Sequence, residues 1–213
     1  LYIHRHFELA VDYHAGRNLS ATPFRTHAYT YDLMGNRASA SVNGGAATTY
    51  TYNAANQLTG DGTNTYTYDD NGNLTNDGTH THTWDRANRL DSVGSHSYTY
   101  DGLGNRVQKT VSGADTDYLL DLKGGLTKVL AQTTGGNTDR VLHGPRGVLG
   151  FENDAGVWSF MVRDALGSIR AEVDNLLSID GARSFAPYGD AFGEQGSFAA
   201  DFGFTGEQTD DND

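Results

Sequence analysis

The amino-acid sequence predicts an all-β protein built from antiparallel β-hairpins. Three observations predict this class: a short unit recurs along the chain, its two aromatic residues flank a Thr, and each unit continues into a turn signal of Asp, Gly and Asn. The clearest copy reads Tyr66-Thr67-Tyr68-Asp69-Asp70-Asn71-Gly72-Asn73-Leu74. A unit that recurs at fixed spacing is the signature of a repeat architecture.

Five copies of this unit follow one another over residues 29–106. The second aromatic residue of each copy falls at positions 31, 52, 68, 84 and 100, so the spacing settles at 16 residues after a first step of 21. In an extended segment the two aromatic side chains share one face and the intervening Thr points to the other. We therefore expect residues 29–106 to form a regular array with one aromatic face.

The loop after each aromatic pair has the chemistry of a tight turn. An Asp side chain bonds the backbone two residues on, and Gly or Asn tolerates the positive φ that a hairpin loop requires. The position before the last residue of the loop alternates between Gly and Asn, which indicates a conformational role. The residues that we assign to the repeat structure are Tyr31, Asp32, Gly35, Tyr52, Asn56, Tyr68, Asp69, Gly72, Trp84, Asp85, Asn88, Tyr100, Asp101 and Gly104.

A second turn signal lies between successive copies, for example at Asp61-Gly62 and Asp77-Gly78. Each repeat then contains two strands of about five residues and two turns, which gives a meandering antiparallel sheet. The alternative is a parallel β-solenoid, because coils of this length could also stack. Tight positive-φ loops at both ends of the unit favour the hairpins.

The segments on either side of the regular array divide the chain further. We expect residues 1–28 to be a degenerate repeat or an irregular N-terminal segment, with a strand over residues 7–13 and a turn at residues 16–18. Residues 107–181 keep the turn signals at spacings of 20 to 22 residues, which predicts longer, divergent repeats and a wider sheet. Residues 182–213 spread aromatic residues among Gly and acidic residues, which predicts an irregular segment.

The repeated unit resembles the YD repeats of bacterial RHS-repeat proteins, which also occur in insecticidal Tc toxin complexes and in animal teneurins. The stretch from Arg163 to Arg170, which includes Asp164, Gly167 and Arg170, resembles the start of the RHS-associated core region. Two later elements, Ala186-Pro187-Tyr188-Gly189-Asp190 and Phe204-Thr205-Gly206-Glu207-Gln208, are similar to further elements of that core. The resemblance spans residues 28–210.

The resemblance implies a structural function. In that family the repeats form a sheet that spirals into a hollow shell and encloses a cleaved C-terminal toxin. The implied partners are the other repeats and the core of the same parent chain, together with the enclosed C-terminal polypeptide. The aspartates with which many members cut their own chain have no counterpart here, so the resemblance assigns no catalytic residue. It implies an extracellular or cell-surface location.

The composition excludes several classes of protein. A net charge of −12 and a pI near 4.9 argue against a nucleic-acid surface or a surface for anionic membranes. The absence of Cys excludes disulfides and thiolate chemistry, and the sequence has no apolar run of membrane-spanning length. Because the sequence begins at Leu1 and not at Met, we interpret it as a piece of a longer protein whose targeting signal lies elsewhere.

Nothing in the sequence selects a catalytic, cofactor or metal site, and we expect no enzyme. His4, His6 and His14, and likewise His80 and His82, are better explained as residues of a strand face than as metal ligands. The stretch from Asp69 to Asn73 is similar to the start of a calcium loop but lacks the downstream Glu.

Two hypotheses for the function have specific support in the sequence. A third, a hydrolase, has no group of candidate catalytic residues behind it. The first is a wall segment of a shell that encloses a toxin or effector polypeptide. The alternative is a carbohydrate-binding or adhesion module whose aromatic rows stack on glycans. Exposed Tyr and Trp rings would favour the glycan partner, and buried rings would favour the shell.

Overall fold

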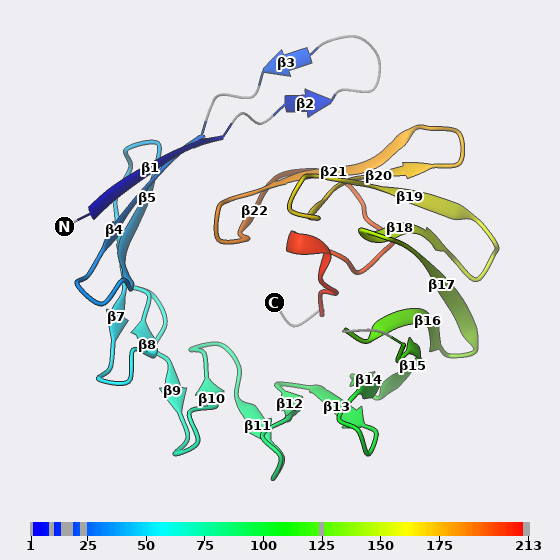
Figure 1. Ribbon diagram of the computed structural model, residues 1–213, viewed down its shortest axis with the longest axis horizontal. Helices are drawn as coiled ribbons and strands as arrows, with labels where there is room; N and C mark the ends of the chain where they lie inside the picture. Colours follow the sequence, from blue (N-terminus) through cyan, green and yellow to red (C-terminus); the bar gives the residue numbers. More distant parts are fainter. Residues whose placement is uncertain (1, 9–10, 14–18, 22–24, 124–125, 211–213) are drawn as a thin grey trace. The chain divides into compact units, whose positions relative to one another are not determined.

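The computed structural model describes residues 2–8, 11–13, 19–21, 25–123 and 126–210. The chain divides into two compact units, Leu1–Gly94 and Ser95–Asp213. Both units consist of β-strands joined by short turns, which confirms the all-β class that the sequence predicts (Figure 1).

The first unit is a series of short hairpins. In it β1 pairs with β4, β4 with β5 and β5 with β6, the pairs β2–β3, β7–β8 and β9–β10 are separate two-stranded sheets, and β11 pairs with β12. The strands are β1 Tyr2–Glu8, β2 Val11–Tyr13, β3 Leu19–Ala21, β4 Arg25–Tyr31, β5 Arg37–Val42, β6 Thr48–Thr49, β7 Thr51–Tyr52, β8 Leu58–Gly60, β9 Thr67–Tyr68, β10 Leu74–Asn76, β11 His82–Trp84 and β12 Leu90–Val93.

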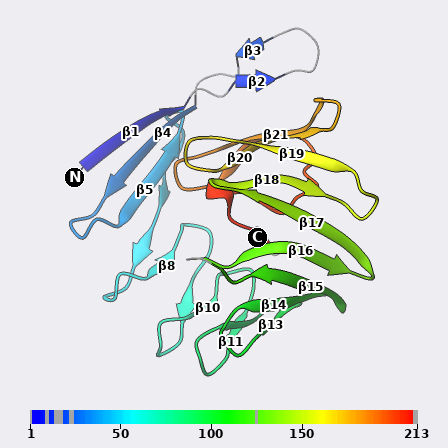
Figure 2. The same cartoon turned by 45° about the vertical axis from the view of Figure 1, so that its right-hand side comes forward.

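The second unit is one continuous sheet in which the strands from β13 to β22 pair in chain order. Its strands are β13 His96–Tyr100, β14 Arg106–Val111, β15 Ala114–Asp121, β16 Lys128–Thr134, β17 Asn137–Gly144, β18 Gly147–Glu152, β19 Trp158–Arg163, β20 Ile169–Asp174, β21 Ile179–Phe185 and β22 Ala191–Gly196, followed by the 3₁₀ turn η1 Phe204–Gly206. Figure 2 shows that successive hairpin turns lie at alternate ends of these strands.

The strand pairs within each unit are antiparallel, which confirms the hairpins and excludes the parallel solenoid for the strands described. The strands of the regular repeats are shorter than the expected five residues, for example two residues in β7 and β9. The register shifts next to each loop, at Tyr52, Leu74 and Trp84, and this irregularity ends the ladder early. Strands reach eight residues in β15 and β17, so the lengthening predicted beyond residue 107 is present.

The core of the second unit lies on the concave face of its sheet. Strands β17 to β20 contribute Val141, Val148, Phe151, Met161 and Ile169, and the C-terminal segment adds Ala200 and Phe202. In Figure 1 this segment, drawn in orange-red and red, runs along the concave face. The core is therefore closed by the chain's own last residues and not by a second sheet.

The two ends of the chain differ in part from the expectation. Residues 182–196 complete β21 and form β22, although the sequence analysis expects an irregular segment from residue 182 onward. The reason is backbone pairing: Ala186 and Asp190 close the intervening loop without an Asp at its first position. At the N-terminus the expected strand is divided between β1 and β2, and the expected turn at residues 16–18 lies outside the described residues.

Candidate functional site

The loop of each repeat is a self-contained hydrogen-bonded unit. In the copy at Asp69, the carboxylate Oδ1 accepts the backbone N–H groups of Asn71 at 2.9 Å and Asn73 at 2.8 Å, and Oδ2 accepts the Asn73 side chain at 2.9 Å. The backbone N–H of Asp69 donates to the Asn73 carbonyl at 2.9 Å. The same pattern recurs at Asp32, Asn53, Asp85 and Asp101.

These hydrogen bonds favour the ionised carboxylate. The side-chain hydrogen bond from Asn73 is the main cause that lowers the pKa of Asp69, and the one from Asn105 does the same for the pKa of Asp101. In the other type of turn, the backbone N–H of Asn64 is the main cause that lowers the pKa of Asp61 to about 2. The repeated carboxylates thus hold the turns in shape and are occupied as acceptors.

The alternating Gly and Asn positions all lie in the left-handed region. The φ angles are 89° at Gly35, 59° at Asn56, 86° at Gly72, 57° at Asn88 and 90° at Gly104. Only Gly, and to a lesser degree Asn or Asp, adopts this conformation without strain.

Asn56 and Asn88 also connect neighbouring loops, a role that the sequence analysis missed. The Asn36 side chain donates to Asn56 Oδ1 at 3.0 Å, and the Asn73 side chain donates to Asn88 Oδ1 at 2.9 Å. Asn71 adds a second donor to Asn88 Oδ1 at 3.1 Å. The alternation of Gly with Asn is the signal that points to this role, because only Asn brings an amide to the left-handed position.

The second aromatic residue of a repeat is a hydrogen-bond donor to the preceding repeat. Tyr52 donates its hydroxyl to the carbonyl of Arg37 at 3.0 Å, Tyr68 to that of Leu58 at 2.9 Å, and Trp84 its indole N–H to that of Leu74 at 2.7 Å. Each acceptor is the first residue after the preceding loop. The available signal was that this slot holds Tyr or Trp in every copy and never Phe.

The two faces of the repeats differ as the sequence predicts. The second aromatic residues, including Tyr31 and Tyr100, are partly buried, whereas Thr51, Thr67, Thr83 and Thr99 are exposed. On the Thr face, cross-strand hydroxyl pairs such as Thr67 with Thr75 at 2.8 Å bridge neighbouring strands. On the aromatic face the Arg37 guanidinium lies over the Tyr50 ring, 4.2 Å from its centroid.

The divergent part of the chain keeps the same loop. Asp164 Oδ1 accepts the backbone N–H groups of Leu166 and Ser168, both at 3.0 Å, and Gly167 has a φ of 97°. Arg170 connects this loop to β21, since it donates to the Arg183 carbonyl at 3.0 Å and to the Ser184 hydroxyl at 2.9 Å. The site residues proposed around Asp164 therefore lie together in one loop and its following strand.

The concave face of the second unit binds residues 197–210 of the same chain. Glu172 on β20 is 1% exposed, and its Oε2 accepts the backbone N–H groups of Ala199 at 3.0 Å and Ala200 at 3.4 Å. The Arg183 guanidinium lies 4.0 Å from the centroid of the Phe198 ring. A buried carboxylate that accepts hydrogen bonds from backbone N–H groups orients a bound peptide whatever side chains that peptide carries.

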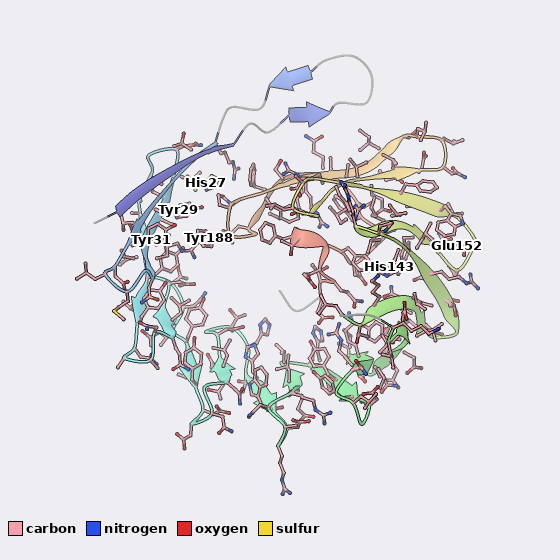
Figure 3. All side chains as sticks on the ribbon, in the orientation of Figure 1. His27, Tyr29, Tyr31, His143, Glu152 and Tyr188 are labelled. Atoms are coloured by element: carbon pink, nitrogen blue, oxygen red, sulfur yellow. The ribbon has the colours of Figure 1, made fainter. Side chains whose placement is uncertain are left out.

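Three further contacts fix this segment. The backbone N–H of Thr205 donates to the Ser168 hydroxyl at 3.0 Å, and Lys109, which is 5% exposed, lies 3.5 Å from Asp210 Oδ1. The Arg106 guanidinium pairs with Asp210 Oδ2. In Figure 3, His143 lies on the concave side of the sheet, whereas Glu152 lies on the opposite side, where it pairs with Arg140 at 3.0 Å.

The described residues contain no group of three or more His, Cys, Asp or Glu side chains arranged to hold a metal ion. In the same part of the chain, no helix has the length and hydropathy needed to cross a membrane. What the structure arranges is a set of peptide-binding and repeat-linking contacts.

Comparisons with known proteins point to one family and one fold. A family model described as Teneurin YD-shell matches residues 15–212. No curated protein matches the chain. The chain is similar to a crystal structure of TcdB2-TccC3, with 15% identity and a TM-score of 0.64 over 99% of this chain and 13% of that chain. A crystal structure of TcdB2-TccC3-Cdc42 gives 14% identity and a TM-score of 0.56 over 98% of this chain and 12% of that one.

At such low identity these structures show a shared fold alone. The chain spans only 12 to 13% of the length of the solved chains that it matches.

Proposed function

This chain belongs to the Teneurin YD-shell family, and from that premise we propose that it forms part of the wall of a β-sheet shell enclosing a C-terminal polypeptide of its own parent protein. The shell is the structural role of the family. The enclosed toxin or effector, the export of the protein and its extracellular or cell-surface location are parts of the proposal.

The observation that carries the proposal is the way in which residues 197–210 lie on the concave face. That face holds a polypeptide through Glu172, Arg183 and Ser168, which contact its backbone or its aromatic rings. A surface built to hold extended chain on the concave side is what a wall around a polypeptide requires. The partners of this chain are then the other repeats, the core segment and the enclosed polypeptide.

The adhesion alternative would need aromatic rows with open rings and open polar atoms. Tyr52, Tyr68 and Trp84 use their polar atoms on the preceding repeat and are partly buried. We therefore rank glycan binding second.

The test is limited proteolysis of the complete parent protein, with the polypeptide downstream of residue 213 followed by mass spectrometry. We expect this polypeptide to resist protease in the native protein and to be digested after the shell is denatured. If the downstream polypeptide is digested in the native protein as fast as in the denatured sample, the proposal that the shell encloses it is wrong. A glycan array probed with the same protein then tests the alternative.

A further inference from the structure

The turns after β17 and β19 lie at the same end of the sheet in the second unit (Figure 2). A hollow with a volume of about 520 Å³ lies between these two turns. Its lining consists of Arg146 from the first turn, Met161 and Arg163 from β19, and residues 164–167 of the second turn. Charged and apolar residues therefore line the same hollow.

The two Arg residues of this lining differ from the other Arg residues of the second unit. The unit contains six, and four of them pair with a carboxylate: Arg106 with Asp210, Arg140 with Glu152, Arg170 with Asp164 and Arg183 with Glu194. Arg146 and Arg163 form no ion pair with a carboxylate of the described residues, and both line the hollow. In a chain with a net charge of −12, two guanidinium groups without a counter-ion in one hollow indicate a site for an anion.

The guanidinium of Arg163 is held across the turn after β17. Its Nη1 donates a hydrogen bond to the backbone carbonyl of Arg146. A Cβ at Gly147 would lie 2.7 Å from this Nη1, so a side chain at that position would displace the guanidinium. Because a guanidinium carries several further N–H donors in a planar fork, this single bond leaves donors for a ligand.

The carboxylate of Asp164 also lies at the hollow, and its charge is matched within its own loop. Its Oδ1 accepts the backbone N–H groups of Leu166 and Ser168, both at 3.0 Å, and its Oδ2 lies 3.5 Å from Nη1 of Arg170. The two Arg residues without a counter-ion therefore leave the lining with positive charge. A ligand with a single negative charge suits this balance.

The turn after β19 is anchored by the C-terminal segment. The backbone N–H of Thr205 donates to the Ser168 hydroxyl at 3.0 Å, and the backbone N–H of Ile169 donates to the Gly203 carbonyl at 3.0 Å. Ser168 and Ile169 are 0% exposed. The wall formed by residues 164–167 is thus in place before a ligand binds, which lowers the entropic cost of binding.

The hollow also has an apolar side, formed by Met161 and Leu166. Met161 belongs to the core, whereas Leu166 is 72% exposed. A carboxylate with a hydrocarbon group matches this lining, because the carboxylate pairs with a guanidinium through two parallel hydrogen bonds while the hydrocarbon covers the apolar side. A phosphate would bring a further charged oxygen toward that side, at a cost in desolvation.

We propose that this hollow binds a carboxylate that carries an apolar group. Arg146 and Arg163 hold the carboxylate, and Met161 and Leu166 contact the apolar group. Two sources can supply this chemistry, a free organic acid and the C-terminal residue of a peptide. The proposal does not depend on the shell function, since all the residues of the hollow belong to the second unit.

Saturation-transfer NMR on the complete parent protein tests the site, with hexanoate, N-acetyl-leucine, acetate and inorganic phosphate as probes. We expect hexanoate or N-acetyl-leucine to bind about tenfold more tightly than acetate, because only the longer acids bury apolar surface. Tighter binding of hexanoate indicates a free acid, and tighter binding of N-acetyl-leucine indicates a peptide terminus. Absence of binding by both acids, or binding no tighter than that of acetate or phosphate, would overturn the proposal.

Four variants of the parent protein assign the binding to this hollow. Arg146→Gln should weaken the binding of the longer acids about fivefold, and Arg163→Lys should weaken it less, because Lys keeps the charge and loses the planar fork. Leu166→Ala should reduce the preference for hexanoate over acetate. Arg140→Gln, which removes the same charge on the opposite face of the sheet, is the matched control.

The Tm of each variant shows whether its fold is retained. Unchanged binding in Arg146→Gln, or an equal loss in Arg140→Gln, would contradict the site. Because the readout is ligand binding and not protease resistance, a failure of this proposal is distinguishable from a failure of the enclosure.

Discussion

Trp84 donates its indole N–H to the carbonyl of Leu74 at 2.7 Å, in the same position in which Tyr68 donates its hydroxyl to Leu58 at 2.9 Å. Two side chains of different shape thus make one hydrogen bond between successive repeats. The slot selects an aromatic ring that ends in a donor, which explains why none of the nine Phe residues of the chain occupies it.

Removing this donor should weaken the link between repeats. Trp84→Phe and Tyr68→Phe keep an aromatic ring but remove the donor to the Leu74 or Leu58 carbonyl, so we expect each to lower the free energy of unfolding by about 1 kcal/mol. Urea denaturation measures this change. Tyr50→Phe, which keeps the ring under Arg37, is the control, and a loss in the control equal to that in Tyr68→Phe would contradict the explanation.

The amide of Asn88 should contribute separately from its conformation. Asn88→Gly keeps the left-handed backbone and removes the acceptor for Asn71 and Asn73, so we expect a loss of about 0.5–1 kcal/mol. Asn88→Ala should cost roughly 1 kcal/mol more, because Ala is strained at this φ. Gly104→Ala measures the cost of placing Ala in the left-handed conformation by itself, because Gly104 has no side-chain amide to lose. If Asn88→Gly unfolds at the same urea concentration as the original chain, the bridges do not stabilise the array.

Acid should destabilise the regular repeats over a defined range. The folded pKa of Asp61 is about 2 and its ordinary value is 3.8, so its ionised form stabilises the fold fully above pH of about 4, and this contribution is lost as the pH falls toward 2. Asp32, Asp69, Asp85 and Asp101 have lowered pKa values and act in the same direction. Circular dichroism in urea between pH 2 and pH 7 follows the change.

The variants Asp61→Asn and Tyr66→Phe assign part of this acid sensitivity. Tyr66 donates its hydroxyl to Asp61 Oδ2 at 2.8 Å, so its removal should raise the Asp61 pKa and move the loss of stability to a higher pH. Asp61→Asn should make the stability of the chain less dependent on pH. An unchanged pH profile in both variants would show that Asp61 does not contribute.

The buried carboxylate of Glu172 should hold the C-terminal segment in place. Glu172→Ala leaves the backbone N–H groups of Ala199 and Ala200 without this acceptor, and we expect their hydrogen exchange to become roughly tenfold faster. Glu152→Ala, on the opposite face of the sheet, is the control and should leave this exchange unchanged. Equal exchange in the two variants would mean that the other contacts of the segment fix it without Glu172.

Much of the fold follows from the sequence because its information is local. The alternation around Thr67 determines which face is aromatic, and the Asp69 loop contains within five residues both the acceptor and the donors that close it. Such loops set hairpins without long-range information. The hairpin β21–β22 escaped prediction because its loop lacks the Asp, and it is held instead by the ladder of the two strands and by backbone hydrogen bonds such as that from Ala186 to Asp190.

The contacts between repeats and on the concave face depend on distances that the sequence does not contain. Asn36 and Asn56 meet because two loops are placed side by side, and Glu172 meets Ala199 across a separation of 27 residues. No pattern of residue types marks Glu172 among the other acidic residues.

The self-contained loop has a consequence for how such a protein can change over evolutionary time. Since the Asp or Asn side chain, the left-handed residue and the backbone close the turn, the side chains of the next two residues are not needed for its shape. These residues are Leu33 and Met34, Ala54 and Ala55, or Arg86 and Ala87. Mutations at these positions leave folding intact while they alter the outside of the molecule. The repeats therefore supply a series of sites where new surfaces can arise by drift, one loop at a time, on a frame that stays the same.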